Sequence, residues 1–133
     1  MASELKVDKF TGVTTAGSIL VTGEGNSTTT NLQQGLAKQW VNIDGTGTLA
    51  VDDSFNVSGV TDQSAGTYLI TFSNNMNNAN FAPVMATEIP SNAADNAYRV
   101  HTFTTSNYGV QFYQGASPTD VDPLTTICTG DLA

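Results

Sequence analysis

The pattern from about residue 41 onward has a period of two, and this limits the fold more than any other feature of the chain. Apolar residues alternate with polar or small ones in three runs: Phe55 and Val57; Tyr68, Ile70 and Phe72; and Tyr108, Val110 and Phe112. β-Branched and aromatic residues in such alternation are typical of strands that bury one face. The chain is therefore expected to fold mainly as β-strands around one core.

Turn-forming residues separate the alternating runs. They lie at Asp44–Gly47, Thr61–Gly66, Ser106–Asn107 and Asp122–Pro123. Gly, Asn, Asp and Pro favour turns through their backbone preferences, so one hairpin is predicted over 55–73 and a second over 97–114. Roughly six to eight short strands without interleaved helices indicate an antiparallel β-sandwich or a small barrel.

Residues 1–30 follow a different pattern. Two short apolar patches, Leu5/Val7/Phe10 and Ile19–Val21, lie among connectors rich in Gly and Thr. This composition opposes a helix, and the patches are too short to form a core alone. We expect an extended N-terminal attachment arm over residues 1–30, with one or two strands, that packs on the β-domain or on a neighbouring copy.

One short helix is predicted over about residues 31–40, at the start of a single β-domain that covers 31–133. Thr30 and Gln33 have the spacing of a capping box, and Leu32, Leu36 and Trp40 fall on one helical face. Gly35 within this helix costs about 1 kcal/mol relative to Ala. The candidate partner interface joins the arm to the helix: Val7, Phe10, Ile19, Val21, Leu32 and Leu36.

Charge and composition exclude several function classes. The 133 residues include four cations and twelve carboxylates, which gives a formal charge of −8. This charge argues against nucleic acid or an anionic membrane as a partner. No signal peptide is recognised, and no apolar run reaches the roughly 18 residues of a membrane span, so no membrane insertion is expected. Polarity resides in twenty Thr and twelve Asn, which bond without titrating and suit a non-catalytic surface.

Residues capable of chemistry are few and scattered. His101 lies within a predicted strand and no Gly-x-Ser-x-Gly motif exists, so a histidine on a strand face is preferred to a catalytic one. Asp52–Asp53 and Asp120/Asp122 are expected in local hydrogen bonds; a calcium site would need about six to eight oxygens and stays open. Cys128 is interpreted as a small buried hydrophobe. We expect no catalytic residue, no cofactor and no metal.

Aromatic residues in the predicted strands allow two interpretations. They are Tyr98, Phe103, Tyr108, Phe112 and Tyr113. Side chains of this kind can stack on a sugar, but more often they pack in the core and against neighbouring strands. The core interpretation is preferred, and a carbohydrate-binding module remains the alternative.

Several stretches have a specific resemblance. Ser3–Asp8, Thr30–Thr48, Asp53–Ser58 and the hairpin that begins at Thr61 resemble small structural, tail-fibre-like virion proteins of marine tailed bacteriophages. The similarity covers roughly residues 3–82. It implies a particle component with a short helix before a β-domain, and it carries no catalytic motif to this chain.

The expected function combines this resemblance with the arm. It is a non-enzymatic structural component of a tailed bacteriophage virion, a surface-displayed β-domain of the tail or fibre apparatus anchored through the arm. Its expected partners are other virion proteins and further copies of itself as a homotrimer, and its location is the virion, after synthesis in the host cytoplasm. The alternatives are a capsid-decoration protein that stabilises the head and a host-recognition module that binds a host-surface glycan.

Overall fold

The computed structural model describes residues 4–12, 19–22, 28–88 and 95–133 and divides the chain into two units, residues 1–36 and 37–133. The predicted boundary lay at residue 30, with the helix in the β-domain. The structure instead places the helix in the first unit. Its first residue, Leu32, donates a backbone hydrogen bond to the Ile19 carbonyl (2.9 Å), which ties the helix to the arm.

The first unit contains a two-stranded ribbon and one helical turn. β1 (Leu20–Thr22) pairs antiparallel with β2 (Thr29–Asn31), and α1 spans Leu32–Gly35. An arm with one or two strands is therefore confirmed. The predicted helix over 31–40 was too long, because residues from Gln39 onward alternate between buried and outward positions and form a strand instead.

The second unit contains two sheets whose strands all pair antiparallel. The first, named here the β3 sheet, contains β3 (Gln39–Asp44), β4 (Ala50–Phe55), β7 (Ala82–Thr87) and β11 (Leu124–Thr129), in the order β4-β3-β11-β7. The second, the β9 sheet, contains β5 (Val57–Ser64), β6 (Thr67–Phe72), β8 (Asn96–His101), β9 (Asn107–Gln114) and β10 (Ser117–Pro118). Its strands pair in the order β10-β9-β6-β5, and β8 also pairs with β9.

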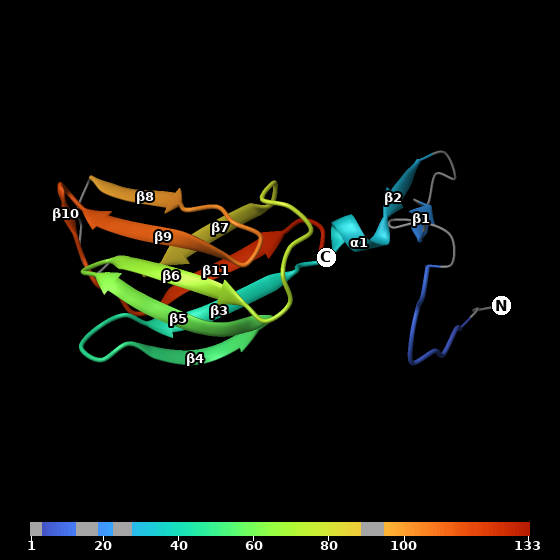
Figure 1. The fold of residues 1–133 in the computed structure, drawn as a ribbon, viewed down its shortest axis with the longest axis horizontal. Helices are drawn as coiled ribbons and strands as arrows, with labels where there is room; N and C mark the ends of the chain where they lie inside the picture. Colours follow the sequence, from blue (N-terminus) through green and yellow to red (C-terminus); the bar gives the residue numbers. More distant parts are fainter. Residues whose placement is uncertain (1–3, 13–18, 23–27, 89–94) are drawn as a thin grey trace. The chain divides into compact units, whose positions relative to one another are not determined.

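The two sheets overlie each other as a sandwich (Figure 1). Both predicted hairpins are confirmed, β5 with β6 and β8 with β9. Neither sheet closes on itself in the described residues, so of the two predicted architectures the structure has the sandwich.

The predicted continuous strand over 55–60 is wrong, because the chain changes sheets at a single residue. Phe55 ends β4 in one sheet, and Val57 begins β5 in the other. Between them, Asn56 has φ of 56°, a left-handed conformation that Asn tolerates better than most residues.

The Asn56 side chain secures this passage. Its Nδ2 donates to the Lys38 carbonyl (2.9 Å) and to the Asn74 carbonyl (3.1 Å), and its Oδ1 accepts from the Asn74 backbone N–H (2.7 Å). One amide thus holds together the start of β3, the crossover and the segment after β6.

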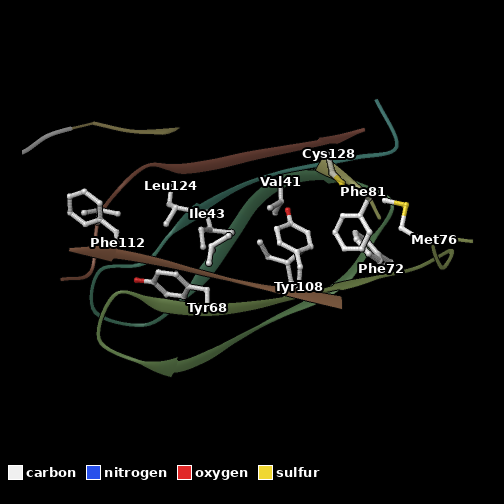
Figure 2. Close-up of a cluster of buried hydrophobic side chains, with 13 residues drawn as sticks. Val41, Ile43, Tyr68, Phe72, Met76, Phe81, Tyr108, Phe112, Leu124 and Cys128 are labelled. Carbon is white, nitrogen blue, oxygen red and sulfur yellow. The ribbon is translucent and has the colours of Figure 1, made fainter. Parts of the chain in front are cut away.

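The core between the sheets is built from the alternating positions that the sequence predicted. Tyr68, Ile70, Tyr108, Val110 and Phe112 have no solvent exposure. Figure 2 shows these side chains as part of a continuous band, with Phe112 near one end and Met76 near the other. Burying one such apolar side chain stabilises a fold by about 1.5–3 kcal/mol, so this band supplies the main favourable term for the unit.

The segment after β6 covers one end of this core. Met76 is buried and pairs with Leu132 in an isolated bridge, while Asn77 N–H donates to the Asp131 carbonyl (2.8 Å). Phe81 follows and packs edge-on against Phe72, with ring centroids 5.5 Å apart. The asparagine side chains of this segment are exposed to solvent, whereas the Met76 side chain is buried in the core.

Candidate functional site

A buried polar cluster connects the two sheets. The Tyr108 hydroxyl, from β9, lies 2.8 Å from Gln39 Oε1 on β3 and 2.7 Å from Thr126 Oγ1 on β11; Gln39 Nε2 donates to the same Thr126 oxygen at 3.2 Å. Burial raises the pKa of Tyr108 far above its usual range, so the phenol is protonated at neutral pH. The three groups satisfy one another, which fits a structural role and not a proton-transfer site.

A second polar cluster fixes the turn between β5 and β6. Asp120 Oδ1 accepts hydrogen bonds from the Gly66 backbone N–H (2.6 Å) and from the Tyr68 hydroxyl (2.8 Å). Burial and then the Asp120 carboxylate raise the pKa of Tyr68 well above its usual range. Gly66 has φ of +63°, and a Cβ there would lie 2.6 Å from the Phe112 carbonyl, so only glycine fits.

His101 ends β8 on the outward side of the β9 sheet. Its ring packs directly on the backbone of Gly109, its register partner, where a Cβ would lie 2.3 Å from Cε1. Nδ1 lies 2.8 Å from Thr102 Oγ1, and Nε2 is buried without a hydrogen-bond partner. The histidine occupies a strand position, as predicted, and in the described residues no carboxylate bonds to its ring.

Carboxylates gather at one end of the sandwich without converging on one point. Burial, followed by repulsion from Asp44, Asp52 and Glu88, raises the pKa of Asp122. Asp44 Oδ1 accepts bonds from Thr46 Oγ1 (2.6 Å) and Thr46 N–H (2.7 Å), which lower the pKa of Asp44. In the part of the chain that the structure describes, no three His, Cys, Asp or Glu side chains are placed to hold a metal ion.

The other candidate carboxylates serve local structure. Asp53 Oδ1 accepts from the Ser54 backbone N–H (2.8 Å), and Asp52 Oδ2 lies 3.5 Å from Asn42 Nδ2. These are the short-range bonds expected of Asp in strands and turns. Asp120, which lies two residues before Asp122 in the sequence, accepts the hydrogen bond from Gly66 described above.

Two further titratable groups lie in the interior. Cys128 has no solvent exposure, as predicted, and burial raises the pKa of its thiol to about 11. Burial also lowers the pKa of Lys38, an effect that the nearby Asp131 carboxylate opposes. A thiol with this pKa is protonated at neutral pH and makes a poor nucleophile.

The five candidate aromatic residues divide between core and surface. Tyr108 and Phe112 are fully buried, which confirms the core interpretation for these two. Tyr98 packs on Phe112 (ring centroids 5.5 Å apart), and Phe103 packs on Phe81 (5.4 Å). Tyr113 remains half-buried on the outer side of the β9 sheet.

Tyr113 belongs to a hydrogen-bonded chain across that sheet. Its hydroxyl donates to Gln111 Oε1 (2.8 Å), and Gln111 Nε2 donates to Thr67 Oγ1 (2.7 Å). Arg99 is the register partner of Gln111 on the adjacent strand and is exposed. This part of the face therefore combines polar side chains with the Tyr113 ring.

The predicted partner-interface residues lie in the first unit without a core of their own. Val7, Phe10, Val21 and Leu36 are exposed, whereas Ile19 and Leu32 are half-buried. With Leu5 and Leu20, the exposed apolar side chains of this unit have between 46% and 74% of their surface accessible. The Ile19–Leu32 backbone bond brings two of the six predicted residues together.

Four further residues were missed by the sequence analysis. Phe55, Trp40, Ile127 and Val84 lie side by side on the outer side of the β3 sheet, one from each strand. Trp40 had been assigned to the helix, and Phe55 to an inward strand position. Their juxtaposition depends on the register of strands distant in sequence, for which the local pattern holds no signal.

No helix in the described ranges is both long and apolar enough to span a membrane. Compared with known proteins, the chain matches no family model, no curated protein and no solved structure.

Proposed function

We propose that this chain is a non-enzymatic structural component of a tailed bacteriophage virion. In this role the sandwich is displayed on the particle as part of the tail or fibre apparatus, and the first unit attaches it. The proposed partners are other virion proteins and further copies of the chain, assembled as a homotrimer.

The observation that carries this proposal is the exposed apolar surface of the first unit. A short ribbon and one helical turn cannot bury Val7, Phe10, Val21 and Leu36, although each gains free energy when it leaves water. The second unit, in contrast, has a core in which every buried member comes from its own residues. Such a division suits an attachment segment joined to a displayed domain.

The sandwich surface and the resemblance support the same role. Hydroxyl and amide groups on the sandwich bond locally without titrating near neutral pH, as Thr104 does with the Asn107 backbone N–H (3.0 Å). Residues 3–82 resemble tail-fibre-like virion proteins of marine tailed bacteriophages. Both features favour a durable particle component over a soluble enzyme.

Truncation tests the proposal in the phage that encodes the chain. A variant lacking residues 1–28 is expected to accumulate as a folded protein in infected cells and to be absent from purified particles by mass spectrometry. The full-length chain with the same tag is the control. Incorporation of the truncated chain at the control level would refute the attachment role.

A capsid-decoration subunit is the second candidate, because a compact acidic sandwich with an attachment arm fits that role equally well. Copy number separates the two roles. A tail element is expected in a few to tens of copies per particle and a decoration protein in hundreds. Counting subunits by quantitative mass spectrometry and locating them by electron microscopy of intact particles decides between them.

Glycan recognition is the third candidate, favoured by the chain Tyr113–Gln111–Thr67 beside the exposed Arg99. Exposed planar polar groups next to an aromatic ring are the usual elements of sugar binding. A glycan array should show binding that Tyr113→Ala abolishes, whereas Tyr98→Ala, on the opposite side of the sheet where the ring packs on Phe112, should preserve it. An array without any bound glycan would remove this candidate.

A further inference from the structure

An uncovered apolar row crosses the whole outer side of the β3 sheet. The row consists of Phe55, Trp40, Ile127 and Val84, which are consecutive register partners across β4, β3, β11 and β7. Between 46% and 63% of the Phe55, Ile127 and Val84 side chains is exposed, and Trp40 is half-buried. Single exposed apolar residues are ordinary, but four in register form a continuous surface.

The next row of the same face is polar on β4, β3 and β11 and ends at Ala86 on β7, so the apolar row has a polar edge along three of its four strands. Thr125 Oγ1 donates to Asn42 Oδ1 (3.1 Å), and Asn42 Nδ2 lies 3.5 Å from Asp52 Oδ2. Asp53 is the register partner of Asn42. A molecule that covers the apolar row therefore meets carboxylates along one side of it.

Charge excludes a second sandwich as the natural cover of this row. Residues 37–133 contain two cations, Lys38 and Arg99, and nine carboxylates, which gives a formal charge of −7. Several of these carboxylates, among them Asp52 and Asp53, lie on the β3 sheet itself. Stacking two such faces would bring like charges together, which is destabilising.

The start of the chain has the complementary chemistry. Leu5, Val7 and Phe10 are all exposed, and Lys6 and Lys9, half of the cations of the chain, lie between them. Residues 4–12 have a formal charge of zero, because the two lysines balance Glu4 and Asp8. Lys6 Nζ lies 3.4 Å from Glu4 Oε1, so the segment offers apolar groups with balanced charges and avoids the like-charge repulsion of a second sandwich.

The length of the Leu5–Phe10 segment also matches the width of the apolar row. The row crosses three strand spacings of about 4.8 Å, or about 14 Å. Five residue steps from Leu5 to Phe10 span about 17 Å when extended. A segment of this length can thus reach across the row. In a fully extended strand Leu5 and Val7 would lie on one side and Phe10 on the other, and the bend at Asp8 interrupts this alternation.

We propose that residues Leu5–Phe10 of one copy dock across the apolar row of a neighbouring copy. This inference rests on the attachment role of the arm and names its first partner, a second copy of the chain. The contact joins two different surfaces, so it is head-to-tail, and such contacts close into rings when the rotation permits. In a closed ring of three copies, every arm docks on a row and every row is covered.

Paired variants of the full-length chain test this docking by sedimentation equilibrium. The row variant is Val84→Thr with Ile127→Thr, which keeps β-branched side chains in both strands but adds a polar group to each. The arm variant is Val7→Thr with Phe10→Ala. We expect the wild type to form trimers and each variant to raise the dissociation constant by about tenfold or more.

Val51→Thr is the matched control. Val51 lies in the same sheet and is 44% exposed, but its register partner is the buried Ile43, so it faces away from the row. This variant is expected to assemble like the wild type. A monomeric wild type, or a row variant that assembles normally, would overturn the docking.

A cysteine pair identifies the copy that is contacted. Val7→Cys with Val84→Cys in one chain should yield, on mild oxidation, a ladder of covalent multimers, since each arm reaches another copy. A covalently closed monomer would mean that the arm docks on its own sandwich, and no cross-link would mean that it docks elsewhere; either result contradicts the inference. Docking can fail while truncation of residues 1–28 still removes the chain from particles, so the two proposals are judged separately.

Discussion

The two units of this chain contain the same kinds of apolar residue, but one unit buries them and the other leaves them exposed. In the sandwich, Val41, Ile43 and Phe112 have no exposed surface, whereas in the first unit Leu5, Phe10 and Val21 are at least half exposed. The difference arises from length, because six-residue strands can stack into two layers and three-residue strands cannot. Apolar burial therefore stabilises the second unit, whereas the ribbon and helical turn of the first unit do not bury these side chains among themselves.

The largest expected effect comes from replacing the same residue type in both units. Phe112→Ala is expected to cost about 3–5 kcal/mol of the free energy of unfolding, because it leaves a cavity between the sheets. Phe10→Ala should change it by less than about 0.5 kcal/mol. Urea denaturation of dilute, unassociated protein measures both. Equal losses would show that the first unit is part of the folding core.

A smaller loss is expected for the polar cluster that joins the sheets. Tyr108→Phe leaves Gln39 and Thr126 buried without their shared partner and should cost about 1–3 kcal/mol. Tyr113→Phe, on the same strand, removes a half-buried hydroxyl and serves as the control with an expected loss below about 0.5 kcal/mol. Similar values for the two changes would contradict the structural role of the cluster.

Alkaline pH should weaken the sandwich through Cys128. Its folded pKa of about 11 lies above the ordinary value of 9.0, so folding favours the neutral thiol. This contribution is fully present below pH 9 and is lost as the pH rises through 11. In Cys128→Ala, the decline in unfolding free energy between pH 9 and 10 should be shallower than in the wild type, as measured by denaturant titration at each pH. Identical slopes would rule out this contribution.

The smallest effect is expected from the carboxylates at the end of the sandwich. Burial, followed by repulsion from Asp44, Asp52 and Glu88, raises the pKa of Asp122, and salt screens such repulsion between exposed charges. Adding sodium chloride at pH 7 should raise the melting temperature slightly, and Asp122→Asn should reduce this rise. A melting temperature that falls with salt in both proteins would mean that repulsion there does not limit stability.

The parts of the fold that were predictable are those specified by neighbouring residues. Alternation placed Tyr68, Ile70 and Tyr108 on the inner side of their strands, and turn residues located both hairpins. The length of the helix was not predictable in this way, because Leu32, Leu36 and Trp40 fit a helical stripe equally well. Only the pairing of β3 with β4 and β11 decides that Trp40 belongs to a strand.

The same limit explains the candidate site. Exposed apolar residues in the arm were evident from its short patches and many glycines. The apolar row was not evident, since its members come from residues 40, 55, 84 and 127 and meet only through three registers. Phe55 is the instructive case: local alternation paired it with Val57, and the left-handed Asn56 separated them.

The single-residue passage at Asn56 leaves the chain no spare length at this point. Val57 and Val60 are the half-buried residues of β5 and both pack against the core, although the register with β6 shifts between Val57 and Gly59. Adding or removing one residue here would displace both valines from the core. A natural length variant of this domain is therefore expected to carry its insertions at the Asp44–Gly47 turn and to keep this bend at constant length.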